Sequence, residues 1–142
     1  MKVKNAMTKK VLVTKPDISV REAAKIMTKY RVGSLVVVEN NELAGIVTEL
    51  DMIWKVVAGD LDPNTTLVKD IMTKKVKTID ADKTLEEAAE IMVNSQIKKL
   101  PVIENKKLVG ILTATDLISV QPKLIEALAK LMLFEEHEPV AG

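Results

Sequence analysis

The chain is a tandem repeat, and the repeat limits the possible folds more than any other feature of the sequence. A shift of 65 residues aligns residues 3–53 with residues 68–118 without a gap, and about 23 of the 51 aligned pairs are identical. Each copy ends on a related heptapeptide, GIVTELD at Gly45 and GILTATD at Gly110. A unit of this length buries too little apolar surface to be stable alone. The repeat therefore predicts two copies of one fold, packed together about a pseudo-twofold axis.

The order of elements within each copy follows from its hydrophobic period and its capping residues. SVRE at Ser19 and TLEE at Thr84 are capping boxes, and each precedes a helix with one apolar stripe. The β-branched runs SLVVV and LPVIE then predict strands, and a polar turn leads into a second strand. A further helix starts at Thr48 or Thr113. The predicted fold class is α/β (α+β), with two β-α-β-β-α motifs packed sheet to sheet.

The predicted domain organisation has three parts. Residues 1–66 form the first motif with its linker, residues 67–121 form the second motif, and residues 122–142 form a C-terminal amphipathic helix and tail. In the C-terminal helix, Leu124, Leu128 and Leu131 share one side with Ile125 and Met132. This stripe, together with the apolar faces of the helices after Asp51 and Asp116, predicts a homodimer.

Composition excludes several classes of protein. Lysine and arginine nearly balance the acidic residues, for a net charge of +1, so neither a nucleic-acid partner nor an anionic membrane is expected. No apolar run is long enough to cross a bilayer, and we expect a cytoplasmic protein. With no cysteine and one histidine, His137, no metal site is expected. The single tryptophan, Trp54, is interpreted as a helix-packing residue rather than a base-stacking one.

The paired motifs resemble a known family. The tandem units, each with a Met-Thr opening, an EAA helix, a Leu-(Val or Pro)-Val strand and a closing GI(V/L)TxxD, are similar to a cystathionine β-synthase (CBS) domain pair, or Bateman module, over residues 3–121. The resemblance implies two CBS motifs in a regulatory module whose ligand is AMP, ADP, ATP or S-adenosylmethionine. It also implies association into disc-like dimers.

The resemblance also implies which residues bind the ligand. Each site would take a Thr and an Asp from one repeat and strand residues from the other. The first predicted site contains Thr48, Asp51, Thr78, Ile79, Ile97, Lys98, Lys99 and Leu100. The second predicted site contains Thr113, Asp116, Val13, Thr14, Val32, Gly33, Ser34 and Leu35.

The repeated Thr and Asp have two interpretations. As a capping box, the pair only starts a helix. As a binding motif, the helix start and the Thr hydroxyl would meet a phosphate, while the carboxylate would accept hydrogen bonds from a ribose. Lys98 and Lys99 stand where the other repeat has Gly33 and Ser34, so the Asp51 site is expected to favour a polyphosphate, unless both lysines are merely solvated surface residues.

The predicted function is that of a stand-alone adenine-nucleotide sensor, regulating a partner protein that the sequence does not identify. No cofactor is required, and the adenosyl ligand is regulatory. An enzyme is not expected, because Asp51 and Asp116 have no Ser, Cys or His nucleophile constellation beside them. A purely structural dimerisation module with empty clefts is the alternative.

Overall fold

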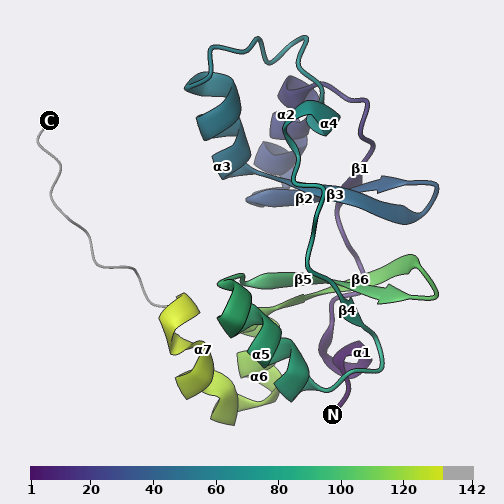
Figure 1. Cartoon of the computed structure of the whole chain (residues 1–142), viewed down its shortest axis with the longest axis vertical. Coiled ribbons are helices and arrows are strands. Elements are labelled where there is room, and N and C mark those ends of the chain that lie inside the picture. Colours follow the sequence, from purple (N-terminus) through teal and green to yellow (C-terminus); the bar gives the residue numbers. More distant parts are fainter. Residues whose placement is uncertain (133–142) are drawn as a thin grey trace, which may run out of the picture. The chain divides into compact units, whose positions relative to one another are not determined.

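Each repeat forms a three-stranded sheet with helices on one face (Figure 1). The structure is a computed structural model, and it describes residues 1–132. The mixed α/β fold class predicted from the repeat is confirmed. None of the helices within the described residues is both long enough and apolar enough to span a membrane.

The first repeat has the predicted order of elements. They are β1 (Val13–Thr14), α2 (Val20–Tyr30), β2 (Ser34–Glu39), β3 (Glu42–Thr48) and α3 (Glu49–Asp51), which continues as the π-helical segment η1 (Met52–Val57). The sheet order is β1-β2-β3, with β1 parallel to β2 and β2 antiparallel to β3. Ser19 caps α2, because its Oγ accepts a hydrogen bond from the Glu22 amide at 3.1 Å.

The second repeat has the same order and adds a C-terminal helix. Its elements are β4 (Ile79–Asp80), α5 (Leu85–Ser95), β5 (Lys99–Glu104), β6 (Lys107–Thr113), α6 (Ala114–Val120), η2 (Pro122–Leu124) and α7 (Ile125–Met132). The sheet order is β4-β5-β6, and β4 is parallel to β5. Thr84 and Glu87 form the full capping box, with hydrogen bonds of 2.9 and 3.2 Å.

The opening segment of each repeat folds with the rest of the other repeat. The second-repeat unit contains Met1–Lys9, Thr78–Glu104 and the described residues from Val109 onward, whereas the first-repeat unit contains Lys10–Lys77 and Asn105–Leu108. Two short helices carry this exchange: α1 (Val3–Ala6) lies in the second-repeat unit and α4 (Val68–Ile71) in the first-repeat unit. The predicted boundaries at residues 66 and 121 divide the chain by its sequence repeat. The compact units do not follow the first of these boundaries, because each unit contains residues from both sides of residue 66.

The glycine of each closing heptapeptide allows the exchanged segment to approach. The amide and carbonyl of Thr73 exchange two hydrogen bonds with Ile46, at 2.8 and 3.0 Å. A side chain at Gly45 would place a Cβ 2.7 Å from the Thr73 carbonyl oxygen, closer than any real contact. In the second-repeat unit, Thr8 pairs with Ile111 in the same way, next to Gly110. The Met-Thr opening of one repeat and the heptapeptide glycine of the other repeat therefore meet in one contact.

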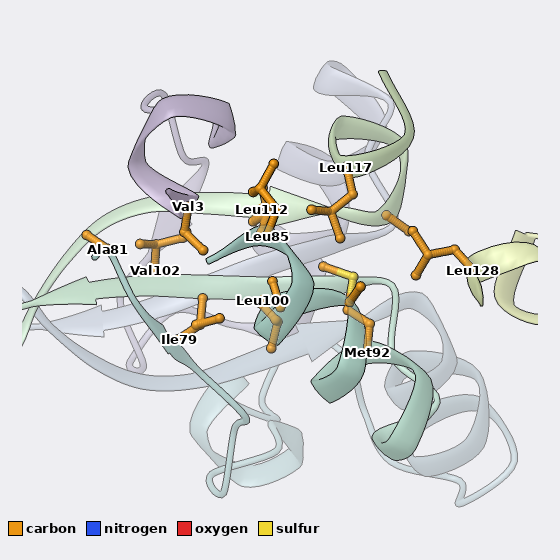
Figure 2. Close-up of a cluster of buried hydrophobic side chains, with 13 residues drawn as sticks. Val3, Ile79, Ala81, Leu85, Met92, Leu100, Val102, Leu112, Leu117 and Leu128 are labelled. Carbon is orange, nitrogen blue, oxygen red and sulfur yellow. The ribbon is translucent and has the colours of Figure 1, made fainter. Parts of the chain in front are cut away.

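Each unit buries its own apolar cluster. In the first-repeat unit the buried cluster joins α2, the sheet and α4, through Val20, Ala23, Met27, Leu35, Val37, Val47, Val56, Val68 and Ile71. In the second-repeat unit the corresponding cluster includes Val3 of α1, and Figure 2 shows its larger members. Each unit thus has a core that is completed by the opening segment of the other repeat.

Helix α7 belongs to the core of the second-repeat unit. Leu128 is fully buried, and its side chain points toward Met92 of α5 and Leu117 of α6 (Figure 2). Leu124 and Leu131 pack against the same cluster, whereas Ile125 is half exposed. The prediction that Ile125 shares the packed side is wrong: η2 ends at Leu124, and Ile125, the first residue of α7, has its side chain half exposed. The part of the predicted C-terminal helix and tail that follows residue 132, including His137, lies outside the described residues.

The corresponding helical face of the first-repeat unit is exposed. Trp54 is 65% exposed, and the interpretation of this residue as packed within the helices is wrong. Its exposed apolar neighbours on α3, η1 and the following turn are Leu50, Ile53, Val57 and Leu61. A groove of about 620 Å³ lies beside them, between Val20 and Ala24 of α2 on one side and Met52 and Val56 on the other.

Candidate functional site

The first candidate site is the junction at which β3 ends and α3 begins. The Thr48 amide and hydroxyl donate hydrogen bonds to Oδ2 of Asp51, at 2.9 and 3.1 Å. The Asp51 amide in turn donates to Oγ1 of Thr48 at 3.1 Å. Thr48 and Asp51 therefore form a capping box, and the Thr48 hydroxyl proton is directed to the carboxylate rather than outward.

The second candidate site is the equivalent junction between β6 and α6. The Thr113 amide donates to Oδ2 of Asp116 at 3.0 Å, and the Asp116 amide donates to Oγ1 of Thr113 at 3.0 Å. The capping role of both Thr and Asp pairs is therefore confirmed. In both junctions the cap uses only Oδ2, so the cap itself leaves Oδ1 of each carboxylate unused.

Each junction lies against the start of the preceding strand of the same repeat. The Glu49 amide donates to the Gly33 carbonyl at 2.9 Å, and Ser34 is the register partner of Thr48. In the second repeat, the Ala114 amide donates to the Lys98 carbonyl at 2.8 Å. The structure thus brings Gly33 and Ser34 beside Thr48, although these residues were predicted for different sites. The grouping of site residues across the two repeats stays a prediction.

Several predicted site residues contribute their side chains to the cores. Leu35, Leu100 and Ile79 are buried, and Thr14 is 8% exposed. The side chains of Val32 and Ile97 are half-buried, and those of Val13, Thr78, Lys98 and Lys99 are exposed.

Thr78 and Ile79 line a pocket within the second-repeat unit. Its volume is about 370 Å³, and its remaining walls come from Asp80 and from the first three turns of α5 and the loop before it. Three carboxylates, Asp80, Glu87 and Glu90, face one ammonium group, Lys83. This negative wall would repel a phosphate, so the pocket suits the uncharged part of a nucleotide better than its charged part.

One residue beside the first junction was missed in the sequence. Lys55 Nζ lies 3.0 Å from Oδ1 of Asp51 and also donates to the Ile71 carbonyl at 2.7 Å. The signal was available, because Asp51 and Lys55 have the i, i+4 spacing of helical ion pairs, and the second repeat has Val120 at the equivalent position.

Metal binding finds no support in the part of the chain that the structure describes. Residues 1–132 contain no cluster of three or more His, Cys, Asp or Glu side chains able to hold a metal ion. His137 and the neighbouring Glu135, Glu136 and Glu138 lie outside that range.

Comparison with known proteins agrees with the repeat. The CBS domain family model matches twice, at residues 3–58 and 68–123. Protein MK0525 of Methanopyrus kandleri is 36% identical over 124 residues, which cover 86% of this chain and 63% of that protein. The CBS domain-containing protein YhcV of Bacillus subtilis is 33% identical over 115 residues, 81% of each chain. The chain thus spans less than two thirds of the Methanopyrus relative.

A solved structure of a CBS domain pair is also similar to this chain. The crystal structure of the CBS domain pair of protein MJ0100, in complex with 5-methylthioadenosine and S-adenosyl-L-methionine, matches with a TM-score of 0.73 at 28% identity. The match covers 87% of this chain and 97% of that one. With two matched domains, a shared fold and this repeat, the chain belongs to the CBS domain family and contains a pair of CBS domains.

Proposed function

We propose that this chain is a regulatory module that binds an adenosyl ligand, namely AMP, ADP, ATP or S-adenosylmethionine, and acts through a partner protein. The observation that carries the proposal is the pair of repeat-equivalent carboxylates, Asp51 and Asp116, each held at a helix start by its own Thr. The adenosyl ligands of the related MJ0100 pair support the ligand class.

The chemistry of the caps fits ribose better than phosphate. A carboxylate accepts two hydrogen bonds from neighbouring hydroxyls without repulsion, whereas it repels an anion. The cap fixes Oδ2 and so orients the carboxylate before a ligand arrives. The first and third amides of each short helix are already bonded, to a strand carbonyl and to the Thr hydroxyl. A phosphate would therefore depend on other groups, such as the exposed side chains of Lys98 and Lys99.

A binding role also fits better than a catalytic one. Neither Asp51 nor Asp116 has a Ser, Cys or His nucleophile constellation beside it in the sequence, and both carboxylates are held in capping boxes. We therefore propose that the chain is not an enzyme. Regulation would require the ligand to favour one of two arrangements that the partner distinguishes.

Homodimer formation is part of the same proposal. The exposed apolar face around Trp54 has the composition of an interface centre, with an aromatic residue among aliphatic ones. We propose that a second copy of the chain covers this face. The same face supports the alternative function, a structural dimerisation module without ligand. A cytoplasmic location stays a prediction from the sequence.

A thermal-shift measurement tests the ligand. A ligand that binds only the folded state, at one hundred times its dissociation constant, stabilises it by about 2.7 kcal/mol and raises the melting temperature by several degrees. We expect such a shift with at least one of AMP, ADP, ATP and S-adenosylmethionine, and a smaller one with adenosine. If none of the four shifts the melting temperature at millimolar concentration, the structural alternative replaces the sensor.

A further inference from the structure

The two candidate carboxylates are in different environments, although their caps are the same. Asp51 is 8% exposed, and both of its oxygens are bonded: Oδ2 to Thr48, and Oδ1 to the Lys55 ammonium at 3.0 Å. Asp116 is half-buried, and its capping bonds involve only Oδ2. Among the side chains that the structure describes, the ion pairs do not include Asp116.

Lys55 is held in place from a second side. Its Nζ also donates to the carbonyl of Ile71, the last residue of α4, at 2.7 Å. A carbonyl at a helix end has no partner within its helix, and a lysine ammonium is a favourable one. The ammonium therefore connects the start of α3 with the end of α4, and we call this arrangement the Lys55 bridge.

The second-repeat unit cannot form this bridge. Position 120, which corresponds to Lys55, is Val120, whose side chain is partly exposed and carries no charge. The segment that corresponds to α4 is present there as α1, so the missing element is the ammonium alone. The Lys55 ammonium is thus a difference between the two junctions that acts directly on the carboxylate.

From this difference we infer that Lys55 withholds the Asp51 carboxylate from a ligand, so that Asp116 is the stronger of the two ribose acceptors. The inference rests on the proposed function and deepens it. A ribose that takes both hydroxyl hydrogen bonds to Asp51 must displace or share the ammonium at Oδ1, whereas Oδ1 of Asp116 faces no such competitor within the described residues. Lys55 acts as a positioning residue, and it reverses the order of affinities expected from Lys98 and Lys99.

The test uses AMP as the probe, isothermal calorimetry as the readout, and the full chain. In an Asp116→Asn background, which leaves Asp51 as the ribose acceptor, Lys55→Val should strengthen AMP binding about tenfold, the scale of one charge-assisted hydrogen bond. In an Asp51→Asn background, the reciprocal change Val120→Lys should weaken AMP binding by about the same factor. Lys55→Met, which keeps a long side chain, serves if Lys55→Val folds poorly.

The outcomes separate this inference from the proposed function. Weaker AMP binding after Lys55→Val would mean that Lys55 contacts the ligand phosphate, and unchanged binding would mean that the bridge is structural only; either result overturns the inference and leaves the proposed function standing. The melting temperature of each variant without AMP shows the structural effect by itself. A parent protein that binds neither AMP, ADP, ATP nor S-adenosylmethionine would overturn both.

Discussion

The helical faces of the two repeats contrast. In the second repeat, α7 covers the face formed by α5 and α6, and Leu128 fills the space between them. In the first repeat, the equivalent face of α2, α3 and η1 is open, and Trp54 stands exposed on it. Both units have an apolar helical face, but only the second-repeat unit has a helix, α7, that covers this face within the described residues. The uncovered face is therefore the part of this molecule that best fits a partner.

This contrast also corrects the basis of the dimer prediction. The stripe of the C-terminal helix was expected to lie in the dimer interface, and Leu128 instead packs within its own unit. The proposed interface consequently moves to the exposed residues around Trp54, including Ile53 and Val57.

The largest effect on stability is expected from the covered face. Leu128→Ala removes a fully buried side chain and should lower the free energy of unfolding by about 3 kcal/mol, with a clear fall in the melting temperature. Trp54→Ala is the matched change on the open face and should alter the stability of the monomer by less than about 0.5 kcal/mol. Chemical denaturation of both variants decides this, and a Leu128→Ala protein as stable as the parent would contradict the packing of α7.

The next effect concerns assembly rather than folding. If a second copy covers the open face, Trp54→Ala combined with Ile53→Asp should dissociate the dimer, since truncation at an interface centre costs about 2 kcal/mol or more. Light scattering at micromolar concentration should show a dimeric parent and a monomeric variant. Ile125→Asp, a change at an exposed residue of α7, is the control and should leave the dimer intact. A monomeric parent would end the dimer proposal.

A smaller difference is expected between the two caps. Asn keeps a side-chain oxygen for capping, so Asp116→Asn should cost less than about 1 kcal/mol. Asp51→Asn also removes the charge facing Lys55 and should cost about 0.5–1 kcal/mol more. Urea unfolding of the two variants measures the difference. Equal losses would show that the Lys55 bridge contributes nothing to the stability of its unit.

The smallest expected effect involves the exchanged N-terminal segment. Lys4 and Lys2 lie 3.1 and 3.6 Å from the Asp82 carboxylate and lower the pKa of Asp82 from its usual value of 3.8. Because the pKa is lower in the folded state, this contribution to stability is present above the unfolded-state pKa and is lost as the pH falls through the folded-state pKa. Asp82→Asn should therefore lower the melting temperature slightly at neutral pH, and the gap to the parent should close in acid below about pH 4. A gap that stays constant from neutral pH into acid would contradict the role of these ion pairs.

Much of the fold was predictable because its signals are local. The caps at Ser19 and Thr84 and the apolar period after them locate α2 and α5, and the β-branched runs locate the hairpins. The exchange of α1 and α4 was not predicted, because a helix of four residues is too short to show a period. The pairing of Thr8 with Ile111 and of Thr73 with Ile46 depends on contacts distant in sequence.

The candidate site was predictable in part. The capping geometry of Thr48 with Asp51 and of Thr113 with Asp116 follows from their spacing and is confirmed. The sequence alone could not show whether Leu35 and Leu100 are core residues or ligand contacts, because an apolar strand residue has the same sequence pattern in either role. The role of Lys55 depends on the Ile71 carbonyl, which only the folded chain brings within reach.

The most direct test of the account is a calorimetric titration of the parent and of the Asp51→Asn/Asp116→Asn double variant with AMP, ATP and S-adenosylmethionine. We expect saturable binding of at least one of these ligands to the parent and an affinity at least tenfold weaker for the folded double variant, because each Asn removes a charge-assisted acceptor for the ribose. Equal binding by parent and double variant would place the ligand elsewhere, and no binding of any of the three to the parent would contradict the adenosyl-sensor function.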